Sequence, residues 1–335
     1  MDSSDLRKVS GSLVREMLTG HERFAVTGAS GWLGRTALEL LAGALGPEDF
    51  RRQVTGFASR DRTMTLCDGT VAELHGFHRL ADLNPPPTHL LHFAFVMRNR
   101  VVAMGVPAYG QANLAILSSV VDAITRFRPR GVFSTSSGAV YEADGLFVAN
   151  IETDPYGTLK RLEELAIRRV AADIGGRSIV TRVFSLGGAY MTRPEQYALG
   201  HFVLQALAGG PIEVRARGRV ERSYCAAADV VAVALACLLS DGPTDLIFDS
   251  AGEAVEMGEL AGHVRDTLQP SDMAIERAWD PAAAPDRYVG DGTQMSALAA
   301  RHGIRMQTLA DQIQETASYL AITGQLAAGG SAGIP

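Results

Sequence analysis

The sequence predicts an α/β fold, a doubly wound parallel sheet with a smaller C-terminal lobe. Short apolar segments alternate with helical patterns throughout the first 185 residues, and this order is typical of a parallel sheet that helices cover on both faces. The chain has 335 residues, of which 47% are hydrophobic and 20% charged. This is an ordinary globular composition that can bury a sizeable core.

The residue pattern assigns each element of this alternation in turn. Asp154 and Pro155 form a helix cap followed by a proline at the first helical position, so a helix is expected from residue 155. Two further helices are expected, one after residue 31 with leucines at helical spacing and one over 113–127. Strands are expected at 24–27, 53–58, 88–95, 131–136 and 178–184.

The pattern loosens after residue 185, which suggests a second lobe. We expect one domain over 22–185 and about 224–255, and a second over about 186–223 and 256–325. The tail over 326–335 is rich in glycine and alanine and is expected to be disordered.

The charge and the apolar segments exclude several classes of partner. A net charge of −6 gives no basic footprint for nucleic acid. The N-terminus lacks the layout of a signal peptide, and the longest apolar stretch, 226–239, is interrupted by Asp229 and too short to span a bilayer. We expect a cytoplasmic protein with no membrane partner.

The three cysteines have no spacing typical of a metal site or of a disulfide framework. Cys67, Cys225 and Cys237 are scattered and form no CxxC pair. Buried thiols in a reducing compartment are therefore expected, with no metal.

A glycine-rich turn follows the first strand and opens a helix. Gly28, Gly31 and Gly34 would allow the tight turn, the close approach of a pyrophosphate and the packing of the helix. The helix N-terminus offers free N–H groups to phosphates. The spacing GxxGxxG differs from the commoner GxGxxG, and an ordinary strand–helix turn is the alternative.

The end of the second strand bears on the choice between NAD and NADP. An acid at this position would hold the 2′-hydroxyl of the adenosine ribose, whereas an arginine suits a 2′-phosphate. Ser59 follows the strand, with Arg60 and Arg62 close behind, which favours NADP. The alternative is a solvated loop in which Asp61 binds the ribose.

A tyrosine and a lysine lie one helical turn apart. Tyr156 and Lys160 share a helix face, and a nearby ammonium is expected to lower the pKa of the phenol. The chain has 31 lysines and arginines, and the two lysines among them are Lys8 and Lys160. A lysine at position 160 in a chain that otherwise uses arginine almost exclusively favours a specific role for Lys160. The hydroxyls of 134–137 follow a strand, where a serine could hold the substrate oxygen.

Taken together, these residues resemble the extended short-chain dehydrogenase/reductase family, whose members include nucleotide-sugar epimerases, dehydratases and reductases. The resemblance spans about residues 23–320 and also rests on the segments 92–95, 182–184 and 222–230. It implies a Rossmann domain, catalysis by Ser137, Tyr156 and Lys160, a nucleotide-sugar substrate and a homodimer formed through helices 113–127 and 156–172.

The resemblance also implies binding residues by position. For the cofactor these are Gly28, Ser30, Gly31, Trp32, Leu33, Gly34, Ser59, Arg60, Ala94, Asn113, Tyr156, Lys160 and Phe184. For the substrate they are Phe95, Ser137, Ser185 and Arg222, the arginine being suited to a diphosphate.

Three departures from the family pattern bear on the reaction. Gly138 and Ala139 replace the Asp-Glu pair of 4,6-dehydratases, which disfavours that reaction. Ser185 replaces an asparagine near the substrate phosphates, and Phe95 replaces a small residue. An NAD(P)-dependent epimerase or oxidoreductase on a nucleotide-linked sugar is expected. A ketone or aldehyde reductase on a non-sugar substrate and a non-catalytic cofactor-binding regulator are the alternatives.

Overall fold

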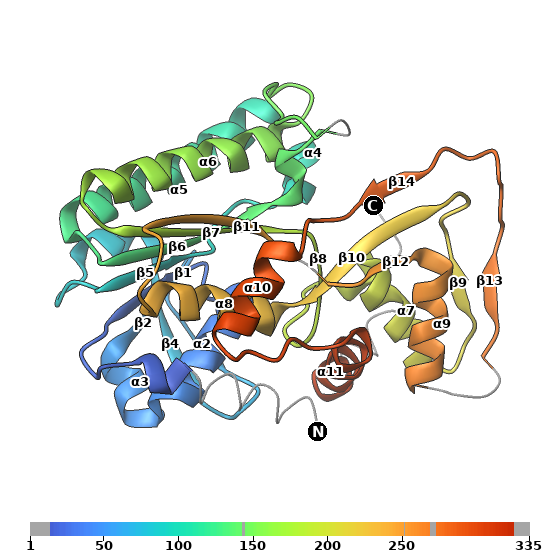
Figure 1. The fold of residues 1–335 in the computed structure, drawn as a ribbon, viewed down its shortest axis with the longest axis horizontal. Helices are drawn as coiled ribbons and strands as arrows, with labels where there is room; N and C mark the ends of the chain where they lie inside the picture. The colour runs from blue at the N-terminus through green and yellow to red at the C-terminus, as the bar shows by residue number, and fades with distance from the viewer. Residues whose placement is uncertain (1–13, 143–144, 251, 269–272, 325–335) are drawn as a thin grey trace.

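The computed structural model describes residues 14–142, 145–250, 252–268 and 273–324, and a large twisted sheet forms its centre (Figure 1). The eight strands have the order β11-β7-β6-β5-β1-β2-β4-β3, and every neighbouring pair is parallel except β3 and β4. The α/β fold is therefore confirmed. The strand bounds are β1 Phe24–Thr27, β2 Val54–Ala58, β3 Arg62–Thr65, β4 Val71–Gly76, β5 His89–His92, β6 Gly131–Ser137, β7 Arg177–Val183 and β11 Asp245–Asp249.

Alternate residues of the central strands feed two separate cores, one on each face of the sheet. Val26, Leu91 and Phe133 belong to one buried cluster, whereas their neighbours Ala25 and Leu90 belong to the other. This alternation is the period of two of a strand whose faces are both covered. Figure 1 shows α5 and α6 on one face and α2, α3 and α8 on the other. These helices are α2 Trp32–Leu45, α3 Pro47–Gln53, α5 Val106–Phe127, α6 Pro155–Asp173 and α8 Ala227–Leu239.

The start of α6 follows from its first residues as expected. The Asp154 side chain accepts a hydrogen bond from the Gly157 N–H at 3.0 Å, and Pro155 occupies the first turn. The cap satisfies one of the N–H groups that a helix start leaves free. It therefore fixes where Tyr156 and Lys160 lie relative to the sheet.

The segment after β5 differs from the expected strand over 88–95. β5 ends at His92, and residues 93–97 leave the sheet before a short turn, η2 (Arg98–Arg100), and α4 (Val101–Met104). The reason is Asn113, whose Oδ1 accepts the Val96 N–H at 2.8 Å. Phe95 is thereby carried out over the end of the sheet instead of lying within it.

Two features of the edge beyond β2 were not expected from the sequence. β3 and β4 form an antiparallel pair, and the turn η1 (Phe77–Asp82) follows them. β3 is mostly exposed, so it lacks the apolar run of a buried strand. Cys67, which follows β3, is exposed, whereas Cys225 and Cys237 are buried as expected.

β10 is the centre of a smaller sheet, in which it pairs with β8, β12 and β14, and this sheet with the elements around it is called the second lobe below. The expected domain bounds stay a prediction. Figure 1 shows β10 and β14 reaching away from the large sheet towards α7, α9 and a small sheet of β9 and β13. The bounds are β8 Ser185–Gly187, α7 Ala198–Leu207, β9 Ile212–Val214, β10 Val220–Ala226, β12 Ala254–Glu256, α9 Met257–Leu268, β13 Ile275–Arg277, β14 Asp286–Tyr288, α10 Thr293–Arg301 and α11 Leu309–Ile322, with the turns η3 Gly138–Val140 and η4 Pro194–Gln196. The expected tail over 326–335 lies outside the described residues. Within the described ranges, the helices are all too short or too polar to span a membrane.

Candidate active site

The glycine turn between β1 and α2 has the shape that a phosphate group needs. Gly28 has φ +65°, and a Cβ there would come within 2.5 Å of the Phe93 carbonyl carbon. A Cβ on Gly34 would overlap the Gly28 carbonyl, so the helix packs close to the turn. Gly31 caps α2 without any side-chain hydrogen bond, which leaves the N–H groups of Trp32 and the following residue available to an anion.

The end of β2 leaves two groups for the adenosine end of a cofactor. Ser59 and Arg60 are exposed, and Arg60 has no ion pair with any residue in the described ranges. Asp61 instead accepts the Gly76 N–H at 2.6 Å, with Arg79 3.8 Å away. This carboxylate ties the β2–β3 loop to β4. Because it is already bonded, Asp61 is less available to bind the cofactor ribose than its sequence position suggests.

The three candidate catalytic residues meet at the carboxyl end of β6. Ser137 is the last residue of β6, and its hydroxyl lies 3.2 Å from the Tyr288 hydroxyl. It is also close enough to the Tyr156 phenol to lower the pKa of that group. Lys160, one turn further along α6, donates to the Thr135 carbonyl at 2.9 Å. Ligands of parallel α/β sheets bind beyond this edge of the strands, and the glycine turn lies at the same edge.

The electrostatics of Tyr156 differ from the sequence prediction. Burial raises the pKa of the phenol, and the nearby Glu163 and Tyr197 raise it further, to about 12. Ser137 and Arg98 act in the opposite direction without reversing the shift. The phenol therefore keeps its proton at neutral pH, whereas an activating ammonium alone would have made it more acidic.

The Lys160 ammonium is buried and contacts a carboxylate and an aromatic ring. Its Nζ lies 3.0 Å from Glu163 Oε1 and 3.9 Å from the centre of the Phe95 ring. Glu163 Oε2 is 3.6 Å from His92 Nε2, and His92 Nδ1 is 2.7 Å from Thr27 Oγ1. A buried row of polar side chains thus runs from the catalytic helix across β5 to β1.

A cavity of about 370 Å³ lies in the second lobe and contains two predicted substrate residues, Ser185 and Arg222. The Arg222 guanidinium is already bonded, to Asp286 Oδ2 at 2.5 Å and to the Glu221 carbonyl at 2.9 Å. Tyr288, two residues beyond Asp286, lies 3.2 Å from Ser137 and so links this lobe to the catalytic residues.

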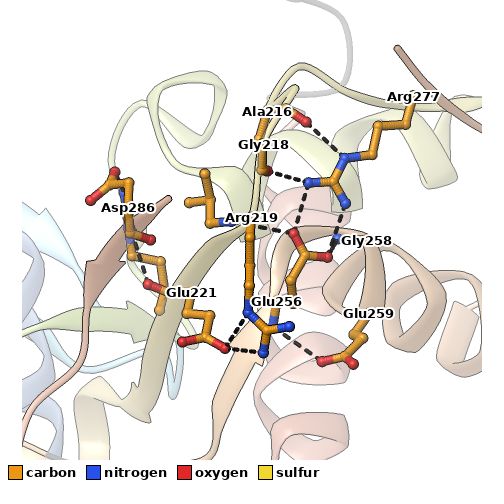
Figure 2. A network of polar contacts seen from close by, with 11 residues as sticks. Ala216, Gly218, Arg219, Glu221, Glu256, Gly258, Glu259, Arg277 and Asp286 are labelled. Carbon is orange, nitrogen blue, oxygen red and sulfur yellow. Dashed lines mark hydrogen bonds and ion pairs between the residues drawn. The ribbon is translucent and has the colours of Figure 1, made fainter. Parts of the chain in front are cut away.

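A half-buried ion pair between Arg277 and Glu256 lies beside this cavity, and Figure 2 shows its contacts. Arg277 donates to both oxygens of Glu256, at 2.9 and 2.7 Å, and to the carbonyls of Ala216 and Gly218, at 2.7 and 2.6 Å. Glu256 Oε2, which lies 2.9 Å from Arg277, also accepts the Gly258 N–H at 2.6 Å. Because Ala216 lines the cavity, these contacts hold the wall in place.

Comparison with known families agrees with this geometry. The family model for the NAD dependent epimerase/dehydratase family matches residues 24–248. The chain belongs to this family. A search of curated protein sequences found no match.

Solved structures of such epimerases and dehydratases share the fold. The UDP-N-acetylglucosamine 4-epimerase from Methanobrevibacter ruminantium M1, in complex with UDP-N-acetylmuramic acid, is 16% identical, with a TM-score of 0.71 over 90% of this chain and 99% of that one. RMD from Pseudomonas aeruginosa, complexed with NADPH, is 20% identical, with a TM-score of 0.68 over 90% and 99%. DesIV from Streptomyces venezuelae, a dTDP-glucose 4,6-dehydratase with NAD bound, is 21% identical, with a TM-score of 0.67 over 89% and 97%. At these identities the likeness concerns the fold.

Members of the NAD dependent epimerase/dehydratase family use NAD(P), and the glycine turn of this chain fits the pyrophosphate of either form. The other predicted cofactor residues lie around the same edge of the sheet. Ala94 touches the glycine turn, since a Cβ on Gly28 would approach its nitrogen to 2.6 Å. Asn113 is buried and bonded to Val96, so it shapes the loop after β5. The Phe184 N–H donates to Ser250 at 2.9 Å, and its ring packs against the Tyr288 ring at a tilt of 44°.

The position that carries an acid in dehydratases has no room for one here. A Cβ on Gly138 would overlap the Phe184 ring. An aspartate at that position would therefore displace Phe184 and, with it, the Tyr288 ring, whose centre is 4.7 Å from that of Phe184. The packing at Gly138 thus opposes the acidic side chain that the family resemblance implies for 4,6-dehydratases.

Two polar residues of the site were missed by the sequence analysis. Tyr288 contacts Ser137 from 151 positions away, and no local pattern announces such a contact. Glu163 lies three residues after Lys160, and this i, i+3 spacing on a helix was a signal that could have found it.

Proposed function

We propose that the chain is an NAD(P)-dependent oxidoreductase or epimerase that acts on a secondary alcohol or ketone of a nucleotide-linked sugar. The observation that supports this most is the meeting of Ser137, Tyr156 and Lys160 at the end of β6, beside the glycine turn. Tyr197, which is close enough to Tyr156 to raise its pKa, lines a cavity of about 370 Å³.

The chemistry of each side chain follows from its contacts. The nicotinamide, when bound, supplies or accepts the hydride. Ser137 donates a hydrogen bond to the substrate oxygen, and Tyr156 exchanges the proton of that oxygen. The phenol carries its proton at neutral pH, so it can act as the acid when a ketone is reduced.

We propose NADP(H) as the preferred cofactor. Arg60 is exposed beside the end of β2 and has no carboxylate partner in the described part of the chain. A guanidinium that is available to the ligand suits a 2′-phosphate. The only acid in that loop, Asp61, is bonded to the Gly76 N–H.

A nucleotide-linked sugar is supported by the second-lobe cavity. Arg222 and Ser185 line it together with aromatic side chains such as Tyr197 and Tyr224, a combination suited to a phosphate and a flat ring. A structural neighbour holds UDP-N-acetylmuramic acid. The substrate would reach from this cavity past Tyr288 to Ser137 and Phe95.

One observation favours the second candidate, a reductase of a non-sugar ketone or aldehyde. Arg222 is already paired with Asp286. Rings also crowd the catalytic phenol, since the centre of Phe95 is 5.6 Å from that of Tyr156. A small apolar carbonyl compound would fit beside these rings without displacing the Arg222–Asp286 pair.

A substrate panel with an arginine variant separates the two candidates. NADPH oxidation is measured with 4-keto nucleotide sugars and with simple ketones, for the parent, for Arg222→Ala and for Arg219→Ala, a matched control that lies just before the same strand. For a nucleotide sugar we expect a KM at least about tenfold higher in Arg222→Ala, because a charge-assisted contact is lost, and unchanged kinetics in the control. Turnover of simple ketones alone, unaffected by Arg222→Ala, would support the second candidate.

We also propose a homodimer formed through α5 and α6. Leu114, Leu162 and Leu165 are large apolar side chains on these two helices, and each is 43–47% exposed. An exposed apolar face of this kind is typical of an interface. Sedimentation velocity is expected to give a dimer for the parent and a monomer for Leu162→Glu/Leu165→Glu.

A further inference from the structure

The buried carboxylate of Glu163 sits beside the catalytic lysine and has no role in the chemistry described above. The Glu163 and Lys160 side chains are 4% and 5% exposed, and Lys160 Nζ is 3.0 Å from Glu163 Oε1. A buried carboxylate is costly unless it is paired, so this contact is a specific arrangement and not a surface ion pair.

Two further contacts complete the enclosure of the ammonium. The Thr135 carbonyl accepts from Lys160 Nζ at 2.9 Å, and the Phe95 ring centre is 3.9 Å from it. An ammonium has three donors, and the chain itself supplies two acceptors and an aromatic face. The position of Lys160 is thus set before any cofactor binds.

We propose that Glu163 is a positioning residue that holds Lys160 on the Thr135 carbonyl and offsets its positive charge beside Tyr156. This inference rests on the proposed function of Tyr156. It assigns to Glu163 control of the pH at which the phenol ionises.

The charges around the phenol agree with this role. Burial acts to raise the pKa of Glu163, but Lys160 and His92 more than offset it and hold that pKa below its usual value. The carboxylate is therefore negative at neutral pH, and it is among the groups that raise the pKa of Tyr156. An ion pair as short as this one acts on a third group as a dipole, which is weaker than a lone ammonium.

The ionisable and charged groups that face this cluster come from several elements. They are Lys160 and Glu163 of α6, His92 of β5, Arg98 of the loop after β5, Tyr109 of α5, Tyr197 before α7 and Tyr288 of β14. Glu163 is the carboxylate that pairs with Lys160. Neutralising it therefore leaves the positive charge of Lys160 uncompensated beside Tyr156.

The test measures ionisation of the phenol and needs no substrate. The ultraviolet absorbance of phenolate is titrated in the cofactor-free chain, and the signal of a Tyr156→Phe counterpart is subtracted. In Glu163→Gln we expect the Tyr156 titration to move down by about one pH unit, which gives about tenfold more Tyr156 phenolate at a fixed pH below the transition. Glu163→Asp restores the charge and is expected to return the titration towards that of the parent. Glu152→Gln, an exposed acid just before α6, is the matched control and is expected to leave it unchanged.

A second variant covers the case in which Glu163→Gln does not fold. Lys160→Met/Glu163→Leu removes both charges, and such a replacement of a buried pair is usually tolerated. If Glu163 offsets Lys160, the Tyr156 titration of this double variant stays within about half a unit of the parent. A rise of one pH unit or more in the Tyr156 titration of the double variant would mean that Glu163 does not offset Lys160, and it would overturn the proposal. A Tyr156 titration that does not move in folded Glu163→Gln would overturn it as well. Neither result depends on turnover, so the proposed function is tested separately.

Discussion

The ion pair between Glu164 and Arg182 fastens the helix that carries Tyr156 to the large sheet. Arg182 donates two hydrogen bonds to Glu164, at 2.8 and 2.9 Å, and the two side chains are 10% and 1% exposed. Removing one partner of a buried pair leaves the other charge uncompensated, which costs about 3–5 kcal/mol. Because glutamine retains the shape and one acceptor, we expect Glu164→Gln to lower the free energy of unfolding by about 3 kcal/mol.

Urea unfolding at neutral pH measures this loss, with a surface pair on the same helix as the control. Arg169 and Asp173 also form an ion pair, at 3.0 Å, but their side chains are 80% and 53% exposed. Asp173→Asn is therefore expected to cost less than about 0.5 kcal/mol. A loss below about 1 kcal/mol in Glu164→Gln would refute the reasoning that this pair fastens α6.

The same pair predicts a pH dependence of stability. Burial acts to raise the pKa of Glu164, but hydrogen bonds from Arg182 outweigh it and leave that pKa below its usual value. The carboxylate therefore stabilises the fold fully above its unfolded-state pKa of about 4.3, and this contribution is lost as the pH falls through the lower, folded-state pKa. The difference in unfolding free energy between the parent and Glu164→Gln should shrink on acidification below about pH 4.3. A difference that stays constant would contradict the assignment.

Three further substitutions test other parts of the site. Gly28→Ala places a side chain at positive φ against Phe93 and is expected to cost about 1–3 kcal/mol of stability, measured by urea unfolding, and to weaken NADP(H) binding at least tenfold. Arg60→Ala is expected to raise the Kd of NADP(H) about tenfold and to leave that of NAD(H) within about twofold, measured by calorimetry; equal effects on both would remove the case for NADP(H). Gly138→Asp overlaps the Phe184 ring and is expected to lower stability by about 2 kcal/mol or more; an unchanged melting temperature would show that the ring can move aside.

The sequence predicts the part of the fold in which each element has its own local signal. β1 is a short buried apolar strand, β6 is a buried strand that begins apolar and ends in serine and threonine, and α6 begins where Asp154 and Pro155 indicate. The glycine turn and the pair Tyr156 and Lys160 could likewise be found, because their spacing within one segment reflects their geometry.

The remaining features depend on contacts between distant segments. The pairing of Tyr288 with Ser137 and of Asp286 with Arg222 arises from the parallel pairing of β10 with β14, which no local pattern specifies. The pKa of Tyr156 could not be predicted either. The sequence indicates the lysine at i+4 but not the burial that dominates the shift.

The proposed function depends most on Tyr156 being the group that exchanges the proton of the substrate oxygen. Hydride transfer from NADPH is measured in a single turnover, for the parent and for Tyr156→Phe, with a carbonyl substrate identified in the panel. We expect cofactor binding within about twofold of the parent, and a transfer rate lower by a factor of about 100 or more, because a positioned acid is lost. A Tyr156→Phe chain that transfers hydride within about threefold of the parent rate would contradict the account.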